Sequence, residues 1–178
     1  TIRKLFATSL EANAVHGLDA AATGANTGAS WVDAFTTLGQ ALAMVECHSS
    51  DSILVAEGTY VPDRLMNNQM AVTPGQSGNS FVLLPDVKIL GGYPTGGGVR
   101  DFAANETILS GNNNAYHVLV SAGDVGSAEL NGFTISDGGS ISTNNTLVYG
   151  YQVYDCSGGG MYASESSPTL KNLIFKDN

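Results

Sequence analysis

Nine residues near the end of the chain repeat a stretch found 40 positions earlier. Placing LNGFTISDG (130–138) over LKNLIFKDN (170–178) matches apolar and acidic residues in four pairs: Leu130 with Leu170, Phe133 with Leu173, Ile135 with Phe175, and Asp137 with Asp177. A shorter likeness places KILGG (88–92) over TILSG (107–111), at an offset of 19. Units of about 20 residues, or twice that across an insertion, that combine β-rich runs with a turn are typical of a parallel β-helix.

Short apolar runs separated by Gly, Asn, Asp, Ser and Pro follow residue 51, which is how strands and turns alternate. The number of strands alone also fits a sandwich or a barrel. The repeat favours an all-β, right-handed parallel β-helix, a solenoid whose inward side chains form apolar ladders. We expect these inward residues to be Ile53, Val55, Val87, Ile89, Ile108, Val118, Val120, Phe133, Ile135, Leu173 and Phe175.

One segment before the strands has helical spacing. Ser30 can cap a helix, Asp33 follows three residues later, and an apolar stripe runs from Trp31 through Leu42 to Val45. The first coil of a solenoid exposes apolar side chains and unpaired backbone groups. We therefore expect an amphipathic capping helix over 31–46. The domain organisation predicted is a lead-in segment over 1–23, followed by a cap and the first coils over 24–178.

The last apolar run, Leu173 to Phe175, is followed by the turn Asp177-Asn178. The pattern stops where the next strand of a coil is expected. We therefore expect the final coil to be covered by the remainder of a longer polypeptide at its C-terminal end or by a partner.

Charge and apolar run length bear on partners. Seven Lys and Arg against sixteen Asp and Glu give a net charge of −9, which repels phosphate backbones, so no nucleic-acid partner is expected. No apolar run approaches the roughly 20 residues that cross a bilayer, so no membrane-spanning segment is expected. Cys47 and Cys156 match no metal-binding spacing, and a disulfide or two thiols fit equally well.

The chain closely resembles the N-terminal part of bacterial right-handed parallel β-helix surface proteins. The resemblance rests on the ordered motifs TGANTGASWVDAFTTLGQAL, ILVAEGTYVP, SFVLLPDVKILGGYP, RDFAANETILSG, YHVLV, LNGFTISDGG and GGGMYASESSPTLKNLIFKDN. These form a pectin-lyase-like family, common in Bacteroidetes and related to the polymorphic outer-membrane protein repeats. The resemblance implies a secreted or surface-anchored protein on the exterior of the bacterial outer membrane. It implies no defined chemistry.

The function expected is an extracellular structural or adhesive β-helix module, non-catalytic by itself, that presents a surface to polysaccharide or protein partners. The alternative is the N-terminal part of a polysaccharide lyase or glycoside hydrolase of the β-helix class. Stacking could pair Asp137 with Asp177 as a hydrolase requires, but a repeated turn acid explains them more simply. His117 is expected to be a solvated strand residue. We assign no catalytic residue.

Two ligand hypotheses follow. Oxygen-bearing residues expected at coil corners would suit a structural calcium ion: Asn112, Asn113, Asn114, Asp137, Asp155 and Asp177. The nonapeptide repeat of calcium-binding solenoids is missing, so we assign no metal ligand and no cofactor. The second hypothesis concerns an insertion over 139–157, which carries Tyr149, Tyr151 and Tyr154. A hairpin there would place Tyr149 and Tyr151 on one face, where they could bind sugars or proteins. The alternative is that the rings pack on the flank of the solenoid.

Overall fold

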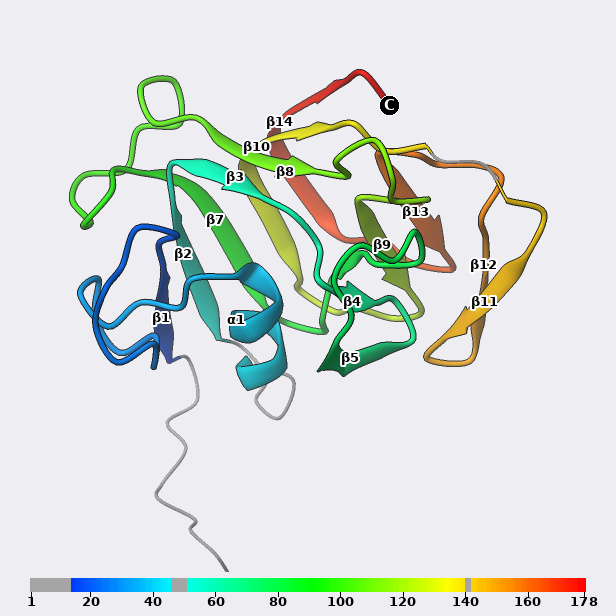
Figure 1. The fold of residues 1–178 in the computed structure, drawn as a ribbon, viewed down its shortest axis with the longest axis horizontal. Helices are drawn as coiled ribbons and strands as arrows, with labels where there is room; N and C mark the ends of the chain where they lie inside the picture. The colour runs from blue at the N-terminus through cyan, green and yellow to red at the C-terminus, as the bar shows by residue number, and fades with distance from the viewer. Residues whose placement is uncertain (1–13, 46–50, 140–141) are drawn as a thin grey trace, which may run out of the picture.

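The computed structural model describes residues 14–45, 51–139 and 142–178, which form strands around a common core with one short helix (Figure 1). In chain order the elements are β1 (Val15–Leu18), α1 (Leu38–Val45), β2 (Ser52–Ala56), β3 (Gly58–Tyr60), β4 (Arg64–Leu65), β5 (Asn68–Val72), β6 (Phe81–Val82), β7 (Lys88–Tyr93), β8 (Thr107–Ser110), β9 (Leu119–Ala122), β10 (Glu129–Ser136), β11 (Asn145–Val148), β12 (Tyr151–Tyr154), β13 (Met161–Ser164) and β14 (Thr169–Lys176).

The main sheet is a stack of parallel strands in the order β1, β2, β7, β10 and β14 (Figure 1). Ile53 lies opposite Ile89, Ile89 opposite Leu130, and Leu130 opposite Leu170. The chain therefore returns to the same place after 36, 41 and 40 residues. A smaller parallel sheet of β6, β9 and β13 lines the other side of the stack. The fold is a parallel β-solenoid of about four turns, as the repeat predicted.

The 40-residue repeat gives the register of the last two turns. β10 pairs with β14 in parallel, with Leu130 opposite Leu170, Phe133 opposite Leu173 and Ile135 opposite Phe175. This part of the prediction is confirmed residue by residue. It follows from stacking, because two turns that share a wall must repeat their apolar positions at the length of one turn.

The 19-residue likeness has a different origin, and reading it as successive coils was wrong. β7 pairs with the first half of β10 and β8 with its second half. β7 and β8 therefore belong to one turn, which residues 94–106 interrupt by an excursion from the stack. Arg100 holds this segment against the stack. Its Nε donates to the Gly91 carbonyl at 2.7 Å, and its Nη2 donates to the Asn131 carbonyl at 2.8 Å.

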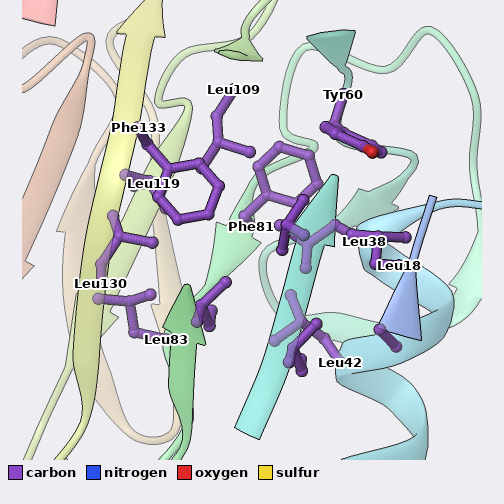
Figure 2. Packing of buried hydrophobic residues seen from close by; sticks show 14 of the residues in the cluster. Leu18, Leu38, Leu42, Tyr60, Phe81, Leu83, Leu109, Leu119, Leu130 and Phe133 are labelled. Carbon is purple, nitrogen blue, oxygen red and sulfur yellow. The ribbon is translucent and has the colours of Figure 1, made fainter. Parts of the chain in front are cut away.

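Apolar side chains from the two sheets and α1 meet between them in one cluster, part of which Figure 2 shows. Eight of the residues predicted to face inward are buried there or in the smaller adjoining cluster: Ile53, Val55, Val87, Ile89, Val118, Val120, Phe133 and Ile135. The prediction that Ile108 faces inward was wrong, because its neighbour Leu109 takes the inward position. Leu173 is half-buried against the cluster and Phe175 is 48% exposed.

The helix begins seven residues later than predicted. Thr37 Oγ1 accepts a hydrogen bond from the Gln40 amide, and Gln40 Oε1 accepts one from the Thr37 amide, both at 3.2 Å. This reciprocal pair is a capping box, and it starts α1 at Leu38. Ser30 and Asp33 make a similar local pattern, since Ser30 Oγ accepts from the Asp33 amide at 3.1 Å, but they close a turn.

The first turn is covered by the loop before α1 as well as by the helix. Gly17 donates to the Gly28 carbonyl at 2.8 Å, and Phe35 donates to the Gly17 carbonyl at 2.9 Å, so the loop satisfies the outer edge of β1. The buried face of α1, including Leu38 and Leu42, packs in the same cluster as Leu18 of β1 (Figure 2). The predicted helical cover over 31–46 is thus corrected to a loop and an eight-residue helix.

Candidate functional site

A hairpin leaves the solenoid at the end of the picture opposite to α1 (Figure 1, orange). β11 and β12 pair in antiparallel fashion, with Val148 opposite Tyr151 and Asn145 opposite Tyr154. The turn between them is Tyr149-Gly150, with φ values of 50° and 88°. Positive φ at both central residues is the turn geometry that matches the twist of a two-residue hairpin.

The hairpin has an inner and an outer face, because side chains alternate along a strand. Val148 and Val153 point inward and are fully buried in the smaller core cluster. Leu147 and Tyr154 are on the outer face and are exposed, and Tyr149 at the tip is 52% exposed. The outer face therefore offers apolar and aromatic surface to solvent.

The structure does not bring the three tyrosines predicted as ligand-binding onto one face. Tyr151 is half-buried against the smaller cluster, where its ring lies over Gly123 so closely that a Cβ there would overlap it. Tyr154 is 44% exposed, and its hydroxyl donates to Gln152 Oε1 at 2.6 Å. Tyr149 and Tyr154 are thus exposed at the surface, while Tyr151 anchors the hairpin to the solenoid.

His117 lies at the base of this hairpin and was wrongly expected to be solvated, because it is completely buried. Its Nδ1 lies 3.1 Å from the Gly158 carbonyl. A carbonyl only accepts, so Nδ1 carries the proton and Nε2 keeps a lone pair. Within the part of the chain that the structure describes, Nε2 has no hydrogen-bond partner. Burial lowers the pKa of His117, and this outweighs the opposite influences of the Gly158 carbonyl and Asp155.

Asp155 follows β12 directly and is only 4% exposed. Its Oδ1 is buried and has no hydrogen-bond partner among the described residues. Burial raises the pKa of the Asp155 carboxyl, against the lowering effects of His117 and Ser142. A buried carboxylate oxygen with no partner costs free energy.

The cavity beside Asp155 has a volume of about 230 Å³. Tyr116, Cys156 and Asn178 contribute side chains to its wall, together with the glycine backbone around 158–159. Cys156 is a free, exposed thiol, and Cys47 lies outside the described residues. Sequence reasoning missed this site. The run YDCSGGG, a carboxylate and a thiol followed by three glycines after a hairpin, is the signal that could have found it.

Two of the residues considered for calcium, Asp137 and Asn114, are engaged locally. Asp137 Oδ2 accepts from the hydroxyls of Ser110 and Ser136, both at 2.7 Å, and these bonds hold the pKa of Asp137 below its ordinary value. Asn114 bonds to Ser77 at 2.9 Å and to the Gly75 carbonyl at 3.0 Å. Among the described residues, no group of three or more His, Cys, Asp or Glu side chains is placed to hold a metal ion.

A helix long and apolar enough to cross a membrane does not occur in the described parts of the chain. Comparison of the sequence and the fold with known proteins found no matching family model, no matching curated protein and no matching solved structure.

Proposed function

We propose that the chain is a structural and adhesive β-solenoid module of an extracellular or cell-surface protein, non-catalytic by itself, which presents its flank to a polysaccharide or a surface protein. The resemblance to bacterial β-helix surface proteins supports a place outside the outer membrane and kinship with pectin-lyase-like folds. The observation that carries the proposal is the change in burial between the last two turns of the stack.

Ile135 is fully buried, yet Phe175, its partner one turn later, is 48% exposed. Leu130 is likewise buried and its partner Leu170 exposed. A cavity of about 530 Å³ opens at this end, lined by Met161, Pro168 and Phe175 among others. A further parallel strand against β14 would fill this space and bury the exposed side chains of Leu170 and Phe175. The last turn is therefore a stacking surface for a further solenoid coil, which we assign to the remainder of a longer polypeptide.

The adhesive part of the proposal rests on the hairpin. Stacked turns hold one another rigidly, while the outer face of β11 and β12 carries exposed Leu147 and Tyr154 away from the core. Aromatic rings with a polar tip are well suited to bind sugars and protein surfaces. A solenoid that carries such a hairpin would hold this binding surface at a fixed distance from the point where the protein is attached.

The alternative, the N-terminal part of a polysaccharide lyase or glycoside hydrolase, finds less support. A hydrolase of this kind needs one carboxyl group that keeps its proton near neutral pH. Asp137, which continues the register beside Asp177, has a lowered pKa because two serine hydroxyls donate to it. Asp137 is therefore poorly suited to be that general acid.

A binding screen tests the proposal. The wild-type chain and the double variant Leu147→Ser/Tyr154→Ser are applied to an array of bacterial and plant polysaccharides. The control is Met70→Ser/Val72→Ser, which removes exposed apolar side chains from β5. We expect wild type and control to retain the same polysaccharides and the hairpin variant to lose them. Absence of any binder, or equal binding by all three proteins, would contradict the adhesive role.

A further inference from the structure

An amine, an amide and a carboxylate meet where β10 pairs with β14, on the face of the sheet that points away from the core. Asn131 lies directly opposite Lys171 in this pairing. Glu129 contacts both side chains: its Oε1 accepts a hydrogen bond from Asn131 Nδ2 at 2.8 Å, and its Oε2 accepts one from Lys171 Nζ at 3.0 Å. One carboxylate therefore bridges an amide nitrogen and an amine that belong to successive turns.

The oxygen of the same amide is held by two donors. Arg100 Nη2 donates to Asn131 Oδ1 at 3.0 Å, and Asn172 Nδ2 donates to it at 2.9 Å. Asn131 itself is only 8% exposed. The amide is thus fixed in orientation, and both donors already point at the oxygen that would become negative if a nucleophile attacked the carbonyl carbon.

We propose that Lys171 and Asn131 form an intramolecular isopeptide bond that joins the last two turns of the solenoid. Nζ of Lys171 attacks Cγ of Asn131, the bond between Cγ and Nδ2 breaks, and Nδ2 leaves as ammonia. Nothing is oxidised or reduced, because one amide is exchanged for another. This modification goes beyond the proposed function and does not depend on it.

The fold supplies the proximity that the reaction needs. Neighbouring strands lie about 4.8 Å apart, so two residues that are opposite each other present their side chains together on one face. Groups held in this way react as though their concentration were about 10⁵–10⁸ M. The parallel register of β10 and β14 repeats over seven residue pairs, which fixes Lys171 beside Asn131.

Glu129 is placed to move the proton that the exchange requires. The attacking nitrogen must lose a proton and the leaving nitrogen must gain one, and Glu129 contacts both nitrogens. The hydrogen bonds from Asn131 and Lys171 hold the pKa of Glu129 below its ordinary value, and Lys88, opposite Glu129 on β7, acts in the same direction. The carboxylate is therefore ionised at neutral pH and can accept the proton from Nζ.

The exposure of Lys171 determines how the reaction should depend on pH. Only a neutral amine is a nucleophile. The Lys171 side chain is 53% exposed, so it exchanges its proton with solvent, and alkaline pH raises the share of neutral amine. We therefore expect the bond to form faster as the pH rises.

Intact mass spectrometry of the full chain tests the proposal. Formation of the bond lowers the mass by about 17 Da, because one ammonia is lost. We expect the wild type to show this loss and to accumulate it faster at pH 9.5 than at pH 7.5. Lys171→Arg keeps a positive charge beside Glu129 and should retain the full mass. The matched control Lys176→Arg, on the same strand, should lose ammonia as the wild type does.

A peptide map identifies the two ends of the bond. Cleavage after Glu165 and Lys176 should release a branched peptide in which 130–165 is joined to 166–176. Asn131 precedes Gly132, and cyclisation of such a pair to a succinimide also releases ammonia. That reaction does not involve Lys171. A mass loss that persists in Lys171→Arg, with no branched peptide, would therefore overturn the proposal.

Two variants test the roles of the surrounding groups. Glu129→Gln keeps an acceptor for Asn131 Nδ2 but takes up no proton, so the bond should form about a hundredfold more slowly. Asn172→Gly removes one donor from Oδ1 and should slow formation about tenfold. Glycine suits this position, because Asn172 has a φ of 49° and Gly132, one turn earlier, has a φ of 85°.

The wild-type mass decides the matter whatever the variants do. A mass that stays at the value of the unmodified sequence after prolonged incubation at pH 9.5 would overturn the bond. Unchanged rates in Glu129→Gln and Asn172→Gly would overturn the assigned roles. None of these measurements uses a ligand, so failure of the bond and failure of the polysaccharide screen are separate results.

Discussion

Leu109 of β8 lies opposite Ile135 of β10, and both side chains are fully buried in the core. The adjacent Ile108 lies opposite Thr134 and is only half-buried. Removing a buried Leu side chain typically costs about 2–5 kcal/mol, because a cavity is left behind. We expect Leu109→Ala to lower the free energy of unfolding by this amount, and Ile108→Ala by clearly less. Urea denaturation measures both, and equal losses would contradict the register.

The start of α1 gives a second prediction. Replacing a capping Thr by Ala typically costs about 1 kcal/mol. We expect Thr37→Ala to reduce the free energy of unfolding by about this amount, because the Gln40 amide loses its acceptor. Ser30→Ala is the matched control, since it removes a similar bond in a loop turn. A larger loss for Ser30→Ala, measured by the same denaturation, would favour the earlier helix start.

Gly39 sits inside α1, where Ala would ordinarily gain about 1 kcal/mol in helix propensity. Here a Cβ would overlap Asp63 Oδ1 and come within 2.8 Å of Arg64 Nε. Both side chains are engaged: Asp63 accepts from Thr37 at 3.3 Å, and Arg64 Nη1 donates to the Gln69 carbonyl at 2.7 Å. Overpacking typically costs about 1–3 kcal/mol. We therefore expect Gly39→Ala to lower the melting temperature.

Met44→Ala in the same helix is the control for Gly39→Ala. Met44 is half exposed, so its truncation should change the free energy of unfolding by no more than about 0.5 kcal/mol. A rise in melting temperature for Gly39→Ala would mean that β4 does not press against the helix at this point.

The buried His117 makes stability depend on pH. Burial lowers its pKa in the folded chain below the ordinary value of 6.5, so below that value the unfolded chain binds the additional proton. This contribution to stability is complete above about pH 6.5 and is lost as the pH falls toward the folded pKa. Asp155 acts in the opposite direction, because its raised pKa makes the folded chain hold a proton that the unfolded chain has released above 3.8.

His117→Asn removes the titrating ring and keeps a donor that can reach Gly158. We expect the wild type to lose more of its free energy of unfolding than this variant between pH 7.5 and pH 5.5. Chemical denaturation at each pH measures the difference. If the free energy of unfolding fell equally with pH in the two proteins, His117 would have to become charged within the folded chain.

Sequence patterns predicted the solenoid because stacking imposes a repeat on apolar positions. The Leu130 and Leu170 segments align without a gap, so their pairing could be predicted residue by residue. The register at Ile108 could not, because TILS offers two adjacent apolar residues and only the pairing with Ile135 selects Leu109. The helix start was ambiguous for a related reason, since Ser30 and Thr37 both precede a suitable hydrogen-bonding partner three residues later.

The candidate site was harder to predict than the fold. A strand position next to Val118 suggested an outward His117, but the ring is buried against Tyr162 and bonds to a carbonyl 41 residues away. Asp155 appeared only as one more turn acid. Its environment depends on how the hairpin folds back on the stack, which no local pattern records. Tyr151 shows the same limit, because its inward face follows from pairing with Val148.

Between Tyr93 and Thr107 the chain leaves one turn of the stack and then returns to it. The spacing of the stacked strands therefore does not depend on the length of this segment. Gly92 donates to Thr107 Oγ1 at 2.9 Å, so the two sides of the interruption are held together whatever runs between them. We expect a change in the length of this segment to leave the pairing of the neighbouring strands in place. The same place is a natural graft point, where a foreign peptide exchanged for part of 94–106 would be displayed from the column while its neighbours keep their pairing.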